Sequence, residues 1–279
     1  MNALEQRMVE VLNEARKRYG VFKMKASFED EGIYPRQLSR FKDIISSARL
    51  PLVVKIGGPE AITDVYLSLD VGAEGLVAPM VETPYALTKY LELIKNKIAY
   101  DNRPDIEFAF NLETITGFKN LDAMLELPDL NLLTGVTLGR VDLIGSMGLG
   151  RDAINTSEEV FNICEEAMAK AKKAGLKTGL GGGIDVEALP FIQKLAESGL
   201  LDMFETRNVC FKADAWRFGE PALEIAGIFE LLHLYSLERY GSRIQAENTG
   251  RIEMLKKRWG RKGEETAAFA EKIISQVTR

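Results

Sequence analysis

Short apolar runs alternate with amphipathic segments between Val21 and Phe211, and this alternation constrains the fold more than any other feature of the sequence. Each run has the length of a buried strand, and most are followed by helical spacing. Such an order over about 190 residues predicts an α/β fold with a parallel sheet, and a spacing of about 25 to 35 residues favours a closed (β/α)8 barrel. The seven predicted strands are 21–28, 50–58, 73–82, 106–113, 133–142, 177–185 and 201–211. One strand of the eight is not evident.

Helices are predicted between the strands, and several carry start signals. Proline opens the segments at Pro35 and Pro84, Asn155 to Ser157 can cap the helix that follows them, and Asp185 can cap another. The predicted helices are 4–18, 35–48, 59–71, the segment from 84, 117–126, 157–174 and 185–197. Residues 219–279 are helical throughout. We therefore expect a barrel with an N-terminal helix over 1–218 and a helical extension over 219–279, which packs on the barrel or on a neighbouring subunit.

Composition excludes several classes of protein. The net charge of −5 argues against a general nucleic-acid binder, and no apolar run approaches the ~18 residues that span a bilayer. The basic cluster Lys256 to Lys262 fits a solvated helix end, with contact to an anionic partner as the alternative. Two cysteines, Cys164 and Cys210, are read as small buried groups in a cytoplasmic protein. The sequence has a single histidine, His233, which excludes a multi-histidine zinc site. Because His233 lies in an apolar helix, we expect it to be packed there.

Two acids follow adjoining predicted strands and point to a metal site. Glu113 ends the run 106–113 and Asp142 ends the run 133–142. The carboxyl ends of parallel strands open onto one face, where α/β folds keep their ligands. Mg²⁺ prefers oxygen ligands and usually takes one or two carboxylates from the protein. A 2-oxo acid could chelate such an ion while Lys55 held its second carboxylate oxygen, and the ion would stabilise an enolate.

Other polar residues at strand ends are weaker candidates. The acidic turn Glu29 to Glu31 has two interpretations, a functional segment or a solvated loop. Arg140 also has two, a substrate-binding residue or a partner of a nearby carboxylate. The glycines Gly181, Gly182 and Gly183 cradle an anion or make a tight turn. Glu82 and Arg207 also stand at strand ends, and Lys25 is a further candidate for substrate binding. Glu113 has an alternative role as the cap of the helix that follows it, although Thr114 and Thr116 could cap that helix themselves.

Three segments in register resemble one known family. They are VVKIGGPEAITDVYLSLDVGAEGLVAPMVETPYAL, NLETITGF and LGRVDLIGSMGLGR. Together they are similar to the 2-oxo acid aldolase and citrate lyase beta-subunit family, of HpcH/HpaI type, over roughly residues 21 to 210. The resemblance implies a modified TIM barrel, Mg²⁺ or Mn²⁺ on Glu113 and Asp142, and aldol or Claisen-type cleavage through a pyruvate-like enolate. It also implies a homo-oligomer, a trimer or hexamer formed by exchange of a carboxyl-terminal helix.

The chain departs from the family pattern at three places. Lys55 stands where arginine is usual, and lysine offers a point charge in place of a planar fork. No histidine is near the acidic turn to act as base, so water, Glu29, Asp30 or Lys25 must substitute. The first barrel strand has no evident counterpart, and the N-terminal helix is expected in its place.

The leading hypothesis is a metal-dependent carbon-carbon lyase or aldolase for a small 2-oxo acid. Its partner substrate is expected to be small, with a phosphorylated or sugar-derived group allowed for near the three glycines, and we expect no nucleic acid or membrane partner. One alternative is a Schiff-base aldolase with Lys55 as nucleophile. The other is a binding or assembly subunit that keeps the barrel without turnover.

Overall fold

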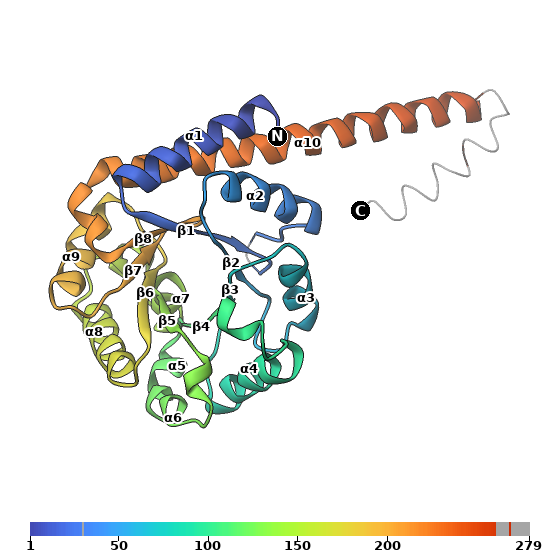
Figure 1. Cartoon of the computed structure of the whole chain (residues 1–279). Helices are drawn as coiled ribbons and strands as arrows, with labels where there is room; N and C mark the ends of the chain where they lie inside the picture. The colour runs from blue at the N-terminus through green and yellow to red at the C-terminus, as the bar shows by residue number, and fades with distance from the viewer. Residues whose placement is uncertain (30, 261–267, 269–279) are drawn as a thin grey trace. The chain divides into compact units, whose positions relative to one another are not determined.

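Eight strands form one closed barrel in the order β1-β2-β3-β4-β5-β6-β7-β8, which confirms the predicted fold class (Figure 1). The computed structural model describes residues 1–29, 31–260 and 268. The strands are β1 (Val21–Ser27), β2 (Leu52–Lys55), β3 (Gly75–Ala78), β4 (Glu107–Leu112), β5 (Gly135–Gly139), β6 (Lys177–Gly181), β7 (Met203–Glu205) and β8 (Val209–Lys212).

The barrel is closed by an antiparallel strand, which the sequence did not predict. β1 to β7 pair in parallel, whereas β8 runs antiparallel to both β7 and β1. The single strand predicted over 201–211 is two strands joined by a turn, in which the Thr206 N–H donates to the Val209 carbonyl at 3.0 Å. A tight turn can join antiparallel strands only. The strand missing from the prediction is thus the last one, and β1 fills the first place.

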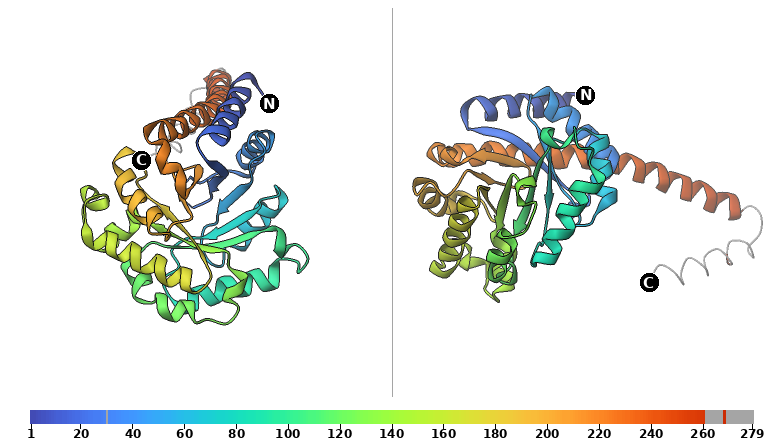
Figure 2. Two further views of the ribbon diagram at one scale, coloured as in Figure 1. Left: turned by 60° about the vertical axis from the view of Figure 1, so that its left-hand side comes forward. Right: turned by 60° about the horizontal axis from the view of Figure 1, so that its bottom comes forward.

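Helices surround the strands in all three views (Figures 1 and 2). The α-helices are α1 (Ala3–Arg18), α2 (Pro35–Ser47), α3 (Ile62–Asp70), α4 (Pro84–Lys97), α5 (Ile115–Lys119), α6 (Leu121–Leu125), α7 (Arg140–Ser146), α8 (Glu158–Lys173), α9 (Leu189–Glu197) and α10 (Glu220–Gly260). Short 3₁₀ turns are η1 (Arg103–Asp105), η2 (Leu130–Leu132), η3 (Arg151–Ile154), η4 (Val186–Ala188) and η5 (Ala213–Phe218).

Helix starts follow the predicted signals. Pro35 and Pro84 are the first residues of α2 and α4, where a missing N–H costs no hydrogen bond. The Ser157 hydroxyl accepts from the Val160 N–H at the start of α8, and the Asp185 carboxylate accepts from the Ala188 N–H. These caps satisfy donors that the helix itself cannot.

Two differences from the prediction affect the elements that follow β4 and β5. The helix predicted over 117–126 is a pair, α5 and α6, joined at Asn120. The strand predicted to end at Asp142 ends at Gly139, so Asp142 lies in the first turn of α7. Within the segment predicted to be helical over 219–279, α10 is continuous from Glu220 to Gly260. The rest of that segment, apart from Ala268, lies outside the described residues.

Side chains alternate between the two faces of the barrel wall. On β4, Phe108 and Phe110 point outward into the apolar layer under the helices and are 2% and 0% exposed. Ala109 and Asn111 point into the barrel. The same alternation places hydrophobic core outside the strands and lysines, acids and amides inside them, so the polar side chains converge on the barrel axis.

The chain divides into two compact units, Met1–Leu232 and His233–Arg279. The first contains the whole barrel and the first turns of α10, and the second continues that helix. All the site residues described below belong to the first unit.

Candidate active site

A cavity of about 460 Å³ opens at the carboxyl ends of the parallel strands. This is the end at which TIM barrels carry their active sites. Its polar lining comes from strands, from the turns after them and from helices α7 and α10, namely Lys25, Lys55, Asn111, Glu113, Thr137, Asp142, Arg151, Glu205, Thr206, Arg207 and Glu230, together with the glycines 181–183. The cavity therefore holds most of the predicted candidates together with residues that were not predicted.

Glu113 is the most buried acid of the cavity, with 5% of the residue exposed. Its carboxylate accepts from the Met80 N–H at 2.8 Å and from the Asn111 side-chain amide at 3.2 Å. Burial raises the pKa of Glu113 because the charged form loses water. The Met80 hydrogen bond and the Lys55 charge lower that pKa, while the Asp142 charge raises it. Glu113 is thus a desolvated carboxylate that a cation would stabilise.

Met80 supports Glu113 through a rarely used backbone conformation. Its φ is 52°, in the left-handed region that costs energy for a residue other than glycine. In this conformation the Met80 N–H points at Glu113 Oε1. Such strain persists where the surrounding structure enforces it, which is most often at functional sites.

Gly139 lets Asp142 and Glu113 face the same cavity. A Cβ at this position would lie 2.5 Å from Glu113 Oε2, so any larger residue would displace the carboxylate. The chain then enters α7, whose first turn carries Asp142. The two acids line one cavity and their charges interact, as the sequence predicted, although Asp142 reaches the cavity from a helix.

The oxygen atoms around Glu113 fit a hard divalent cation. The carboxylates of Glu113 and Asp142 both line the cavity, and the Asn111 Oδ1 atom is buried without a hydrogen-bond partner in the described part of the chain. A buried acceptor with no donor is costly unless an ion or water satisfies it. Within residues 1–29, 31–260 and 268 no three or more His, Cys, Asp or Glu side chains form a metal cluster. A site of two carboxylates completed by water and substrate, the usual pattern for Mg²⁺, stays a prediction.

Lys55 and Glu29 lie together, as two of the predicted catalytic residues. The Lys55 Nζ atom is 2.6 Å from Glu29 Oε2, and the lysine side chain is only 10% exposed. Lys55 lines the cavity, where its charge acts on Glu113, whereas Glu29 is not among the lining residues. Asp30, the third predicted catalytic residue, lies outside the described residues.

Lys25 forms a buried ion pair with Glu205, an acid that the sequence reasoning missed. The side chains of Lys25 and Glu205 are 14% and 8% exposed, and both line the cavity. The other Glu205 oxygen accepts from the Cys210 thiol, whose pKa is raised by burial. Glu205 ends β7, but the reading of 201–211 as one strand placed the strand end at Arg207 and beyond. Predicting the turn at Thr206 would have identified Glu205 as a residue at a strand end.

Arg140 does not contact the cavity, which corrects the expectation that it binds substrate. It is fully buried, and its guanidinium donates to the carbonyls of Gly182 and Gly183 at 3.0 and 2.9 Å and to Asn155 Oδ1 at 2.8 Å. Burial lowers the pKa of Arg140 to about 10. The side chain fastens the turn after β6 to the loop before α8, so it positions the cavity wall.

The glycines after β6 do line the cavity. Gly182 and Gly183 have φ angles of 78° and 61°, which non-glycine residues rarely adopt. A Cβ on Gly182 would also lie 2.7 Å from the Val141 backbone nitrogen. Their structural role is therefore clear, and anion binding there stays a prediction.

Two arginines complete the lining. Arg207, which stood in the predicted set of strand-end residues, lies 3.4 Å from Glu230. Arg151 was not singled out; it opens η3 and is exposed, and no ion pair involving it is seen in the described residues. Its position at the end of LGRVDLIGSMGLGR was the only available signal.

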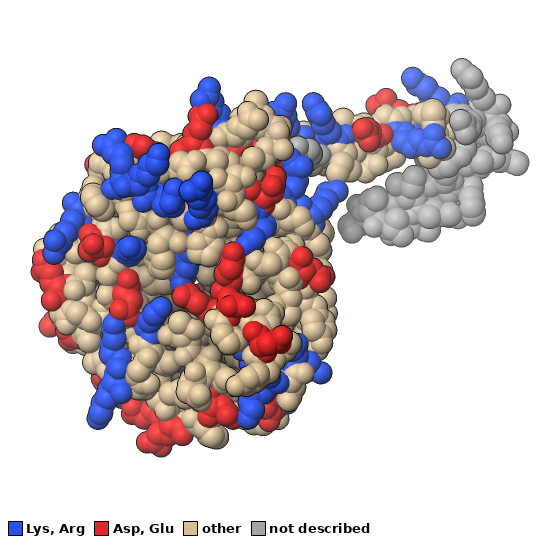
Figure 3. Space-filling view, viewed as in Figure 1, with Lys and Arg blue, Asp and Glu red and all other residues tan. Residues whose placement is uncertain are grey.

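The remaining predictions concern residues away from the cavity. Cys164 and His233 are buried, and burial raises the pKa of Cys164 to about 12 and lowers that of His233 to about 4. The cluster 256–262 is only partly described. Basic and acidic side chains are interspersed on the barrel face shown in Figure 3. In the described part of the chain, no helix combines the length and apolar character that crossing a membrane requires.

Fold and site together define an α/β barrel with an acid-lined, lysine-bearing cavity at the carboxyl ends of its strands. Residues 45–180 match the family model described as HpcH/HpaI aldolase/citrate lyase, which confirms the resemblance found in the sequence. No curated protein matches the chain.

Solved structures of that family share the fold. One is a HpcH/HpaI aldolase/citrate lyase family protein from Burkholderia cenocepacia J2315, at 19% identity and a TM-score of 0.56 over 78% of this chain and 95% of that one. A HpcH/HpaI aldolase from Desulfitobacterium hafniense DCB-2 has 16% identity and a TM-score of 0.56, over 71% and 81%. The citrate synthase SbnG has 16% identity and a TM-score of 0.57, also over 71% and 81%. At these sequence identities, the likeness shows a shared fold and nothing further.

Proposed function

We propose that this chain is a divalent-metal-dependent carbon-carbon lyase or aldolase acting on a small 2-oxo acid. The observation that carries the proposal is the placement of Glu113 and Asp142 on one cavity, with Lys55 close enough for its charge to act on Glu113. Glu113 and Asp142 would hold Mg²⁺ or Mn²⁺, and Asn111 Oδ1 would accept from a water beside the ion. A bound divalent ion supplies Lewis-acid stabilisation of negative charge on a substrate oxygen.

Cations of the cavity wall bind and orient the substrate carboxylate in this proposal. Lys55 provides a point charge next to the two acids, and Arg151 provides the planar fork that grips a carboxylate in two places. The arginine thus supplies the bidentate contact that lysine cannot make. The match to the aldolase/citrate lyase family supports the assignment of reaction class.

Proton transfer falls to the pair Lys25 and Glu205. Both side chains line the cavity, whereas Glu29 is paired with Lys55 and is not among the lining residues. The only histidine of the chain, His233, is not among the cavity residues. A general base must reach the proton that it removes, so position favours Glu205 over Glu29.

A pyruvate-release assay with 4-hydroxy-2-oxo acids tests the reaction class. Activity should vanish with EDTA, return with Mg²⁺ or Mn²⁺, and fall at least 100-fold in Glu113→Gln and Asp142→Asn, because each removes one anionic ligand. Glu126→Gln, an exposed acid outside the cavity, is the matched control. Full activity in EDTA, or in the Glu113→Gln, Asp142→Asn double variant, would refute the proposal.

The Schiff-base alternative has a separate test. If Lys55 forms a Schiff base with pyruvate, borohydride reduces it to a stable adduct that mass spectrometry detects. The ion pair with Glu29 works against that chemistry, because it stabilises the protonated ammonium. We expect no adduct. Metal binding without product from any 2-oxo acid or acyl-CoA would instead indicate a binding or assembly subunit.

A further inference from the structure

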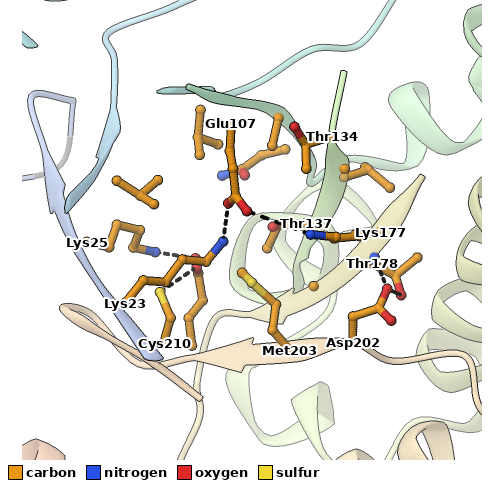
Figure 4. Close-up of a pocket in the computed structure, with 18 of the residues that line it drawn as sticks. Lys23, Lys25, Glu107, Thr134, Thr137, Lys177, Thr178, Asp202, Met203 and Cys210 are labelled. Atoms are coloured by element: carbon orange, nitrogen blue, oxygen red, sulfur yellow. Dashed lines mark hydrogen bonds and ion pairs between the residues drawn. The ribbon is translucent and has the colours of Figure 1, made fainter. Parts of the chain in front are cut away.

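A second cavity, of about 240 Å³, lies inside the barrel and opens at the opposite end, where the parallel strands begin (Figure 4). It shares Lys25, Lys55, Asn111, Thr137 and Glu205 with the catalytic cavity, and these side chains form a polar floor between the two. Within this floor, Lys25 is paired with Glu205 and Lys55 with Glu29. The mouth of the second cavity lies at the opposite ends of the strands, among Lys23, Glu107, Lys177 and Lys212.

The wall of this second cavity is apolar and lined by small residues. TIM barrels usually fill their interior with bulky branched side chains. Here Ala109, Gly135 and Gly179 line the interior, and Val53, Val77 and Met203 supply an aliphatic surface. An apolar wall with a few polar groups at its ends is the usual composition of a small-molecule site. The volume is below the roughly 300 to 1,000 Å³ of drug-sized sites, so the ligand must be short.

The mouth of the second cavity carries an excess of positive charge. Lys23 and Lys177 both pair with Glu107, at 2.6 and 3.8 Å, so two ammonium groups share one carboxylate. Lys212 joins them because β8 is antiparallel and ends where the other strands begin. Asp202, the other acid near this end, is 2.5 Å from Lys172 and also accepts from the Thr178 N–H. Figure 4 shows Lys23 and Lys177 on either side of Glu107.

We infer that the N-terminal mouth of the barrel binds a small amphipathic monocarboxylate, of the short aliphatic class. The carboxylate lies between Lys23, Lys177 and Lys212, where it compensates the two ammonium charges in excess of Glu107. The aliphatic tail lies against Val53, Val77 and Met203. This inference is independent of the proposed reaction, since no ligand of the metal site takes part in it.

Binding of hexanoate, measured by ligand-observed NMR and calorimetry on the full chain without metal, tests the site. Hexanoate should bind, with nuclear Overhauser contacts to the Met203 methyl group, and hexylammonium should bind at least tenfold more weakly. The double variant Lys177→Gln, Lys212→Gln removes two exposed charges and should weaken hexanoate at least tenfold. A control double variant, Lys17→Gln, Lys173→Gln, changes two exposed lysines elsewhere and should leave it unchanged.

The location is checked by variants at each end. Ala109→Leu fills the interior and should abolish hexanoate binding; if it does not fold, the lysine variants still decide. Glu113→Gln, Asp142→Asn should bind hexanoate as the wild type does, even where it has lost metal. Equal binding of hexylammonium, full binding in Lys177→Gln, Lys212→Gln, or loss in Glu113→Gln, Asp142→Asn would overturn the inference.

Discussion

Glu113 combines burial with a neighbouring like charge, and both make its ionised form less stable. Its pKa is raised above the ordinary value of 4.5, chiefly by burial and in part by Asp142. A metal ion bound at this site would therefore compete with a proton for the same oxygens.

Metal affinity should consequently rise with pH. Below pH 4.5 the Glu113 carboxyl is protonated in both the folded and the unfolded protein. Above pH 4.5 the unfolded chain ionises first, because the pKa is raised only in the folded state. The contribution of Glu113 to the stability of the metal-free protein is therefore lost as the pH rises through this raised pKa. Mg²⁺ bound at the proposed site would reverse the loss, because it would stabilise the ionised form. Calorimetric titration of Mg²⁺ at several pH values should show tighter binding and less proton release as pH rises. A pH-independent affinity would contradict this account.

Met80 provides a second test at the residue scale. Met80→Gly suits the φ of 52° and removes a side chain that is 46% exposed, so Mg²⁺ affinity should stay within threefold of the wild type. Met80→Val places a β-branched residue in the same conformation and should lower the free energy of unfolding by about 1–2 kcal/mol. It should also weaken Mg²⁺ by displacing the N–H that holds Glu113. Equal behaviour of the two variants would show that the strain has no role.

Among the elements, β8 completes the barrel. It has only four residues, and it pairs with both β7 and β1 to close the sheet. It is held by an aromatic pair. Phe204 on β7 and Phe211 on β8 stack with ring centroids 5.0 Å apart at 11°, and both rings are fully buried. Their burial stabilises the turn at Thr206 and so the placement of Glu205.

Phe211→Ala should therefore lower the free energy of unfolding by about 3–5 kcal/mol, the usual cost of a large buried cavity. Phe218→Ala, at a residue that is 45% exposed, should cost much less and serves as the control. Urea denaturation followed by fluorescence gives both values. Similar losses in the two variants would mean that β8 is not a critical closure.

The same strand marks the limit of what the sequence could predict. Periodicity found β1 to β6, because each is a single apolar run bounded by glycine, proline or a helix, and it found the acids at their ends. It failed over 201–211, where the polar turn Thr206 to Asn208 is short enough to pass for the middle of one strand. Asn111, Thr137 and Glu205 were missed for a related reason, since only register shows which strand residues face the barrel axis.

On the scale of the whole molecule, the single histidine reports on folding. Burial lowers the pKa of His233 to about 4, against 6.5 for an unperturbed imidazole. The folded chain therefore keeps this ring neutral, and the associated stability is present above pH 6.5 and lost as pH falls towards 4. The loss amounts to about 3 kcal/mol, from about 1.4 kcal/mol for each pKa unit.

The ring resonance of His233 needs no assignment, because the chain has one histidine. An NMR titration should show it titrating near pH 4, and in His233→Gln the fall in unfolding free energy between pH 6.5 and 4 should be smaller by that amount. Titration near pH 6.5 in the folded protein would contradict the burial.

Because β8 is antiparallel, the chain enters and leaves the barrel at the same end. The Lys212 N–H donates to the Gly20 carbonyl at 3.0 Å, so the last residue of β8 is hydrogen-bonded to the residue that precedes β1. The segments that lead to α1 and α10 therefore both join the barrel at the end opposite to the cavity that Glu113 and Asp142 line.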